Sequence, residues 1–258
     1  KTILKDEPNN VDAMRLLGIL ATKGGKYKIA EQILAKAIKI APSYSLLWRN
    51  ISLVYRLSGQ LEKAQKSMDN ILALDPKNAS VWADYGTILI MLAKYKEAIV
   101  AYNEYIDTKP KDIKSIYNRG RAYEQIGDLE SARKDFTRVL DIDINNLNAS
   151  LSMGQYWYGK KDYNKAIAFF DKVLEVDGRE SMAYLLKGRS LHQKADFKGA
   201  RANYDLAIDF DKRNAEAFLY RGALKIVQNQ KRSACNDLNR ALALGAEDAK
   251  AAIARHCK

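Results

Sequence analysis

The chain has 258 residues, with 47% hydrophobic and 29% charged side chains and a formal net charge of +12 at pH 7. Only four prolines and 14 glycines are present, which excludes collagen-like and proline-rich disordered chains, and no apolar run reaches the roughly 18 residues of a membrane-spanning helix. The 31 acidic residues are interleaved with the 43 basic ones, which argues against nucleic acid as the partner.

From Val11 to Asp248 the sequence repeats with a period of 34 residues and without insertion. We expect residues 1–10 to be the end of a truncated repeat, because Ile3 and Pro8 fit its positions 27 and 32. Residues 249–258 are expected to form a capping helix that covers the last repeat. The seven full blocks between these ends are 11–44, 45–78, 79–112, 113–146, 147–180, 181–214 and 215–248.

Each block alternates small and large residues in a way that predicts two closely packed helices. Proline at position 32 of three blocks is expected to end the second helix, because it has no N–H to donate. Position 8 holds Gly18, Ser52, Gly86, Gly120, Gly154, Gly188 and Gly222, and position 20 holds Ala30, Ala64, Ala98, Ala132, Ala166, Ala200 and Ala234. Large residues fill position 24: Leu34, Met68, Tyr102, Phe136, Phe170, Tyr204 and Leu238.

This arrangement resembles the tetratricopeptide repeat, and the resemblance covers about nine tenths of the chain. Ser150 departs from the pattern at position 4, which holds a large residue in the other six blocks, and Ile144, Lys212 and Ala246 depart from it at the proline position. The resemblance implies an all-α fold, a right-handed α-solenoid superhelix of helix-turn-helix repeats. We expect residues 1–258 to form a single domain of this kind.

In the family, the first helices line a concave groove with positions 2, 5, 6, 9, 12 and 13. Helix geometry supports positions 5, 9 and 12, because their i, i+4, i+7 spacing places them on one face. Arg15, Lys23, Arg49 and Arg56 form a basic cluster that favours an acidic or carboxylate-bearing segment, although a solvated basic surface without a ligand is the alternative. The full set of predicted partner-binding residues is Arg15, Lys23, Arg49, Asn50, Arg56, Lys114, Tyr117, Asn118, Arg121, Tyr158 and Arg189.

The resemblance implies a scaffold or adaptor that binds a protein or peptide partner, expected to be acidic, in the groove. Chaperone-binding members hold a terminal carboxylate with a specific set of lysine, asparagine and arginine residues, and no three consecutive blocks match that set. We expect no enzyme activity, no cofactor and no metal. The only two histidines, His192 and His256, lie in different repeats, and neither has a cysteine or carboxylate at the spacing of metal ligands.

Two other readings of the chain remain open. The repeats could be the substrate-recruiting arm of a larger enzyme, of sulfotransferase or glycosyltransferase type, with its catalytic domain before Lys1. Self-association through the groove is the other. Discriminating these readings requires the sequence upstream of Lys1 and the mass of the particle in solution.

The two cysteines, Cys235 and Cys257, lie 22 residues apart in the last repeat and the cap. They form either a disulfide that pins the cap or a pair of buried free thiols. The segment from Ala234 to Cys257 also resembles C-terminal repeats of bacterial envelope-associated tetratricopeptide proteins, especially in the Bacteroidetes. A disulfide would imply an oxidising compartment, so the localisation stays open between the cytoplasm and the bacterial periplasm or envelope.

Overall fold

The computed structural model describes residues 7–76 and 78–257, and every regular element within these ranges is an α-helix. The expected all-α fold is therefore confirmed, whereas Ile3 and the other predictions for residues 1–6 lie outside the described part. The helices are α2 (Val11–Lys23), α3 (Tyr27–Ile40), α4 (Ser45–Leu57), α5 (Leu61–Leu74), α6 (Ala79–Met91), α7 (Tyr95–Thr108), α8 (Ile113–Gln125), α9 (Leu129–Ile142), α10 (Leu147–Gly159), α11 (Tyr163–Val176), α12 (Ser181–Gln193), α13 (Phe197–Phe210), α14 (Ala215–Val227), α15 (Lys231–Ala243) and α16 (Ala249–His256).

Each 34-residue block contains one helix pair, and its first helix begins at the first residue of the block. The described helices group into two compact units, unit 1 ending at Asp135 and unit 2 beginning at Phe136, within α9. The single domain expected from the repeats therefore stays a prediction.

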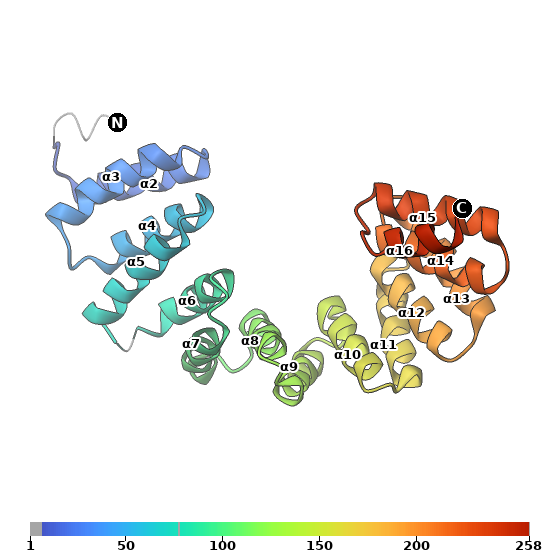
Figure 1. Ribbon diagram of the computed structural model, residues 1–258. Helices are drawn as coiled ribbons and strands as arrows, with labels where there is room; N and C mark the ends of the chain where they lie inside the picture. The colour runs from blue at the N-terminus through green and yellow to red at the C-terminus, as the bar shows by residue number, and fades with distance from the viewer. Residues whose placement is uncertain (1–6, 77, 258) are drawn as a thin grey trace. The chain divides into compact units, whose positions relative to one another are not determined.

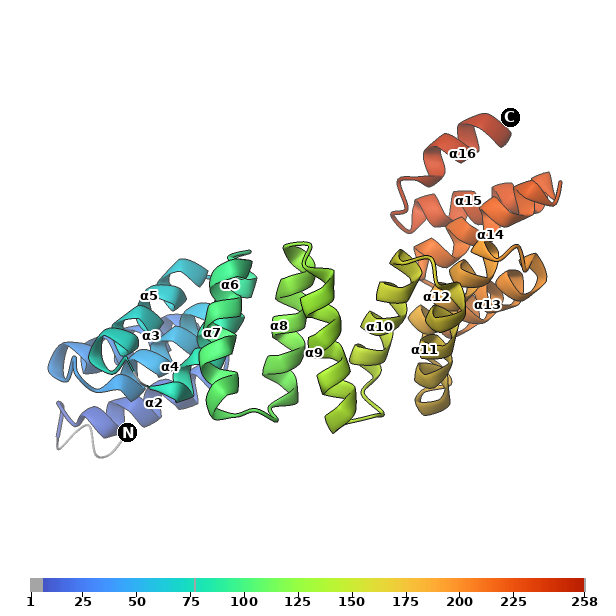
Figure 2. The ribbon, with the colours of Figure 1, turned by 90° about the horizontal axis from the view of Figure 1, so that it is seen from below.

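Within each unit, helix pairs stack in chain order, as Figures 1 and 2 show for α2–α5 and for α12–α15. A second helix packs against its own first helix and against the first helix of the next repeat, as α3 does with α2 and α4. First helices of successive repeats also contact one another, in the pairs α2 and α4, α6 and α8, α10 and α12, α12 and α14. We call the exposed side of the first helices in each unit its first-helix surface.

The small residues sit directly opposite the large ones of the same block. All seven position-20 alanines are buried with at most 1% of their surface exposed, so nothing longer than a methyl group fits there. A Cβ atom added to Gly86 would lie 2.9 Å from the Tyr102 ring, and one added to Gly188 would lie 2.7 Å from the Tyr204 ring. Position 8 is small because the position-24 side chain occupies that space.

Gly154→Ala is expected to lower the free energy of unfolding by about 1–3 kcal/mol, because its Cβ would overlap the Phe170 ring. Gly159→Ala in the same helix is the matched control, since nothing lies within 4 Å of the added Cβ. That control should be neutral or stabilising by up to about 1 kcal/mol, as glycine is a poor helix former. Urea denaturation followed by circular dichroism measures both changes, and equal stability of the two variants would contradict the proposed packing.

Proline is not what ends the second helices. The helices followed by Pro42, Pro76 and Pro110 stop at position 30 of their blocks, and so do those followed by Ile144 and Lys212. In the two blocks with Ile144 and Lys212, the next first helix begins at a polar cap, where the side chains of Asn146 and Asn214 accept hydrogen bonds from Ala149 N and Ala217 N. These caps satisfy N–H groups that the helix itself leaves unpaired, so the turn forms with or without proline.

Polar contacts link neighbouring repeats at position 7 of one block and position 25 of the block before it. The sequence pattern did not predict them, although the residue types at the two positions match in each pair. The hydrogen bonds and ion pairs of this kind are Tyr85 to Asp69 at 2.6 Å, Arg119 to Asn103 at 2.8 Å, Lys187 to Asp171 at 2.6 Å and Arg221 to Asp205 at 2.7 Å. Where position 7 is the buried Ile51, the partner position holds Ala35 in the same apolar cluster.

Both arginines of these pairs also bind a buried carboxylate within their own repeat. Arg119 donates from Nε and Nη2 to Asp135 at 2.8 and 2.6 Å. Arg221 does the same to Asp237 at 2.8 and 2.7 Å, and Lys225 Nζ donates to that carboxylate at 2.7 Å. Burial has the largest single effect on the pKa of Arg221 and lowers it, but the hydrogen bonds and negative charges of Asp237 and Asp205 together leave the pKa raised.

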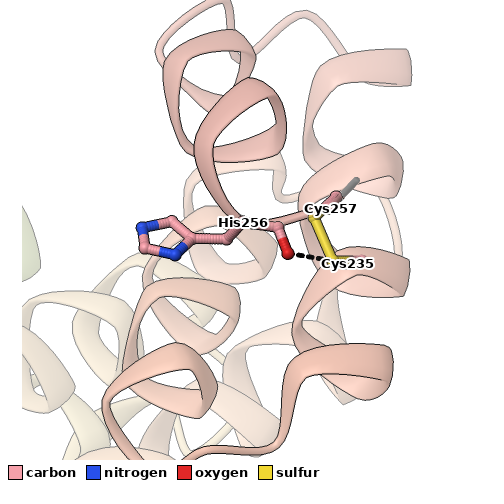
Figure 3. The surroundings of a disulfide bond; sticks show 3 residues. All are labelled: Cys235, His256 and Cys257. Carbon is pink, nitrogen blue, oxygen red and sulfur yellow. Dashed lines mark hydrogen bonds between the residues drawn. A yellow bond between two sulfur atoms is a disulfide. The ribbon is translucent and has the colours of Figure 1, made fainter.

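The C-terminal helix α16 covers the last repeat. Ala249 is fully buried beside Leu238, and Ile253 packs on the same apolar cluster. Cys235 of α15 forms a disulfide with Cys257, which follows α16, across a Cα–Cα distance of 5.6 Å (Figure 3). The His256 carbonyl oxygen lies 3.8 Å from Cys235 Sγ, while the His256 side chain points away from the bond. The disulfide therefore joins the capping helix to repeat seven covalently.

Candidate partner-binding surface

A pocket of about 410 Å³ opens on the first-helix surface of unit 1, beside α4 and α6. We call it the α4–α6 pocket. Three of the predicted partner-binding residues, Arg49, Asn50 and Arg56, line it together with Asp84. All three come from α4, and they line the same pocket because their spacing places them on one side of that helix. The apolar part of the lining is Leu46, Leu53, Met68 and Ile88.

The two arginines of the pocket differ in whether a carboxylate neutralises their charge. Arg49 donates from Nε and Nη2 to Asp84 Oδ2, at 3.1 and 2.8 Å, so its charge is already paired. Arg56 makes no ion pair with any residue that the structure describes. Asp84 occupies groove position 6 of its repeat, but the sequence did not indicate that it would bind Arg49. The free positive charge of the pocket is therefore that of Arg56.

Asn50 has an unused hydrogen-bond donor in the same pocket. Its Nδ2 atom is buried, and no acceptor lies within hydrogen-bond distance among the described residues. A buried amide without a partner is uncommon in folded proteins and costs stability. An oxygen acceptor supplied by a bound segment would satisfy this donor.

Exposed leucines accompany the polar groups of unit 1. Leu46, Leu53 and Leu57 on α4 are more than one third exposed, and Leu20 on α2 is 64% exposed. Leu46 and Leu53 also line the α4–α6 pocket. The surface therefore offers apolar contact area next to a cation.

Arg15 and Lys23 do not join Arg49 and Arg56 in this pocket. Arg15 pairs with Asp12 of its own helix at 3.3 Å, and Asp12 also accepts from the Tyr44 hydroxyl at 3.1 Å. Lys23 is exposed at the last turn of α2. The cluster of four basic residues expected from the sequence is thus reduced to two in the pocket.

The predicted residues on α8 are partly used in other contacts. Asn118 makes a hydrogen bond with the buried Tyr102 hydroxyl, and Thr87 lies 3.1 Å from the same hydroxyl. Arg121 pairs with Glu124 at 2.8 Å, while burial raises the pKa of that carboxyl. The remaining two predicted residues of α8 differ in accessibility: Lys114 is exposed and Tyr117 is half-buried.

In unit 2, the two predicted residues lie together. The Arg189 guanidinium of α12 lies over the Tyr158 ring of α10 at 5.2 Å and over the Tyr220 ring of α14 at 4.7 Å. Tyr204 of α13 stacks on Tyr220 with ring centroids 6.1 Å apart. We call these four residues the Arg189 cluster. The sequence alone indicated neither Tyr220 nor Tyr204 as part of a binding surface, although Tyr158, Arg189 and Tyr220 recur at intervals of 31 residues on successive first helices.

Two family models match the chain, over residues 55–118 and 113–146, and both describe the tetratricopeptide repeat. The helix pairs of the structure repeat with the same 34-residue period. The chain is a tetratricopeptide repeat protein. Proteins built from these repeats are generally protein-interaction scaffolds, typically without catalytic activity. No curated protein matches the sequence.

Solved structures share the fold of this tetratricopeptide repeat protein at low sequence identity. A tetratricopeptide repeat protein from Parabacteroides merdae aligns with a TM-score of 0.74 at 20% identity, over 91% of this chain and 93% of its own. PilF of Pseudomonas aeruginosa aligns with a TM-score of 0.67 at 22% identity, over 83% of this chain and 97% of its own. YrrB, described as having an unusual peptide-binding site, has a TM-score of 0.60 at 21% identity, over 71% of this chain and 95% of its own. These similarities establish the solenoid fold of stacked repeats.

Residues 7–76 and 78–257 of this tetratricopeptide repeat protein contain no group of three or more His, Cys, Asp or Glu side chains placed to hold a metal ion. Burial lowers the pKa of His192, whose ring makes an edge contact with Phe197 at 5.4 Å. None of the described helices combines the length and the apolar character needed to cross a bilayer.

Proposed function

We propose that this tetratricopeptide repeat protein is an adaptor that binds an acidic segment of a partner protein at the α4–α6 pocket. The observation that supports the proposal most is the state of Arg56, which lines the pocket without an ion pair among the described residues. The net charge of +12 favours the approach of an acidic partner over long distances.

The pocket combines three kinds of contact that an extended acidic segment would use. Arg56 would form a charge-assisted hydrogen bond with a partner carboxylate. Asn50 would donate from Nδ2 to a backbone carbonyl of the partner, and its burial makes that bond valuable. Apolar partner side chains would pack on Leu46 and Leu53, which are exposed on α4.

A structural neighbour gives the proposal further support. YrrB shares the solenoid fold and is described as a tetratricopeptide repeat protein with a peptide-binding site. The same fold therefore supports peptide binding at low sequence identity.

Arg56→Glu is expected to weaken partner binding by roughly tenfold or more, because it replaces an attractive contact by a repulsive one. Lys66→Glu, on an exposed site of α5 in the same repeat, changes the net charge equally and should have no effect. Affinity capture with the intact protein, followed by peptide mapping, identifies the bound segment. Isothermal titration of a synthetic copy of that segment then measures both variants.

Arg56 is the better target than Arg49. A glutamate in place of Arg49 would lie beside Asp84 and could weaken binding by disturbing the fold, because the two carboxylates would repel each other. Binding of Arg56→Glu at the strength of the unmodified protein, with unchanged circular dichroism, would refute the proposed site.

A further inference from the structure

The Arg189 cluster on the first-helix surface of unit 2 contains a cation whose orientation is fixed. Its two flanking rings come from the neighbouring first helices α10 and α14, at 5.2 and 4.7 Å from the guanidinium carbon. Rings that contact a guanidinium in this way attract its charge and limit its rotation. The Arg189 side chain is still 27% exposed, so part of it remains accessible from solvent.

The hydrogen-bonding capacity of this cluster is only partly used. Arg189 Nε is buried and has no acceptor, and the buried Tyr204 hydroxyl also lacks a partner among the described residues. The nearest carboxylate oxygen, Oε2 of Glu216, lies 3.9 Å from Arg189 Nη1, which is beyond hydrogen-bond distance. Glu216 itself is more than half exposed, so it is a weak competitor for the arginine.

We propose that the Arg189 cluster is a second binding site, specific for a carboxylate group of a peptide. A planar carboxylate matches the fork of a guanidinium and accepts two parallel hydrogen bonds from it. The inference rests on the proposed function, because it assumes a peptide partner, but it assigns a separate anchor in the other unit. The carboxylate is either the C-terminal group of a chain or an aspartate or glutamate side chain.

This site differs in composition from the carboxylate clamp of chaperone-binding repeats, whose lysine and asparagine set is absent here. Recognition at Arg189 depends on a single arginine that two tyrosines hold in place. Replacing it by lysine keeps the positive charge but removes the planar fork. A lysine would therefore retain non-specific attraction and lose the paired hydrogen bonds.

The test is a titration of the ¹⁵N-labelled 258-residue chain with three short, N-acetylated peptides made of glycine, serine and leucine. The first has a free C-terminus and no acidic residue, the second is amidated and contains one glutamate, and the third is amidated with glutamine instead. The Arg189 Nε–H resonance, assigned by its absence in Arg189→Lys, should shift with at least one of the two carboxylate peptides. The peptide that shifts this resonance identifies the source of the carboxylate.

Arg189→Lys should bind the effective peptide roughly tenfold more weakly. Arg213→Lys, at an exposed position before α14, is the matched control and should leave binding unchanged. The inference is overturned if neither carboxylate peptide shifts the resonance at its solubility limit, if the glutamine peptide shifts it equally, or if Arg189→Lys binds as the unmodified chain does.

The two proposals fail in different ways. If Arg56→Glu weakens capture of the partner segment while Arg189→Lys leaves the peptide titration unchanged, the adaptor function stands and the second site is wrong. If Arg189→Lys weakens peptide binding while Arg56→Glu has no effect on capture, the carboxylate site stands and the α4–α6 pocket is not the binding site.

Discussion

Asp237→Asn is expected to lower the free energy of unfolding by about 3–5 kcal/mol, as usual when one partner of a buried ion pair is removed. Asp237 accepts hydrogen bonds from Arg221 and Lys225, and the side chains of Asp237 and Lys225 are only 7% and 9% exposed. The neutral amide has nearly the same shape but leaves the Lys225 charge buried without a carboxylate. Urea denaturation measures the loss, and hydrogen exchange in α14 and α15 shows whether it is local.

Asp205→Asn is the matched control for this change. Asp205 contacts the same Arg221 at 2.7 Å, but its side chain is 44% exposed, so the loss should be within about 1 kcal/mol. Adding Lys225→Met to Asp237→Asn should recover part of the stability, since the unpaired charge is then removed. If Asp237→Asn and Asp205→Asn cost the same, burial is not what makes this pair important.

Reduction of the Cys235–Cys257 disulfide is expected to destabilise the C-terminal cap by about 3 kcal/mol, the loop-closure entropy of a link between residues 22 apart. The loss should appear in α15 and α16, because each repeat of a solenoid contacts only its neighbours. Hydrogen exchange of the oxidised and reduced chains, followed by peptide, measures it. Cys257→Ser should behave like the reduced protein.

The reduced chain also provides its own control, because unit 1 contains no cysteine. Exchange in α2–α5 should be the same in both redox states. Unchanged protection of α16 after reduction would mean that the apolar contacts of Ala249 and Ile253 alone hold the cap.

The pocket and the Arg189 cluster could be predicted only in part. Repeat positions placed Arg49, Asn50 and Arg56 on one helix face, and the structure brings these three together in the α4–α6 pocket. Positions alone could not show that Asp84 neutralises Arg49, because this depends on side-chain rotamers across two repeats. The same limit applies to Asn118, whose position suggested the groove but which also binds the Tyr102 hydroxyl.

The sequence by itself determined the repeat length and the helix-packing positions. It could do so because methyl-sized and large side chains recur in phase. Only the tertiary structure decided which charges are free. Arg49 and Arg56 both line the α4–α6 pocket, yet Arg49 pairs with Asp84 of the next repeat and Arg56 is unpaired among the described residues. Pairing depends on distances of a few ångströms between side chains, which a 34-residue period does not specify.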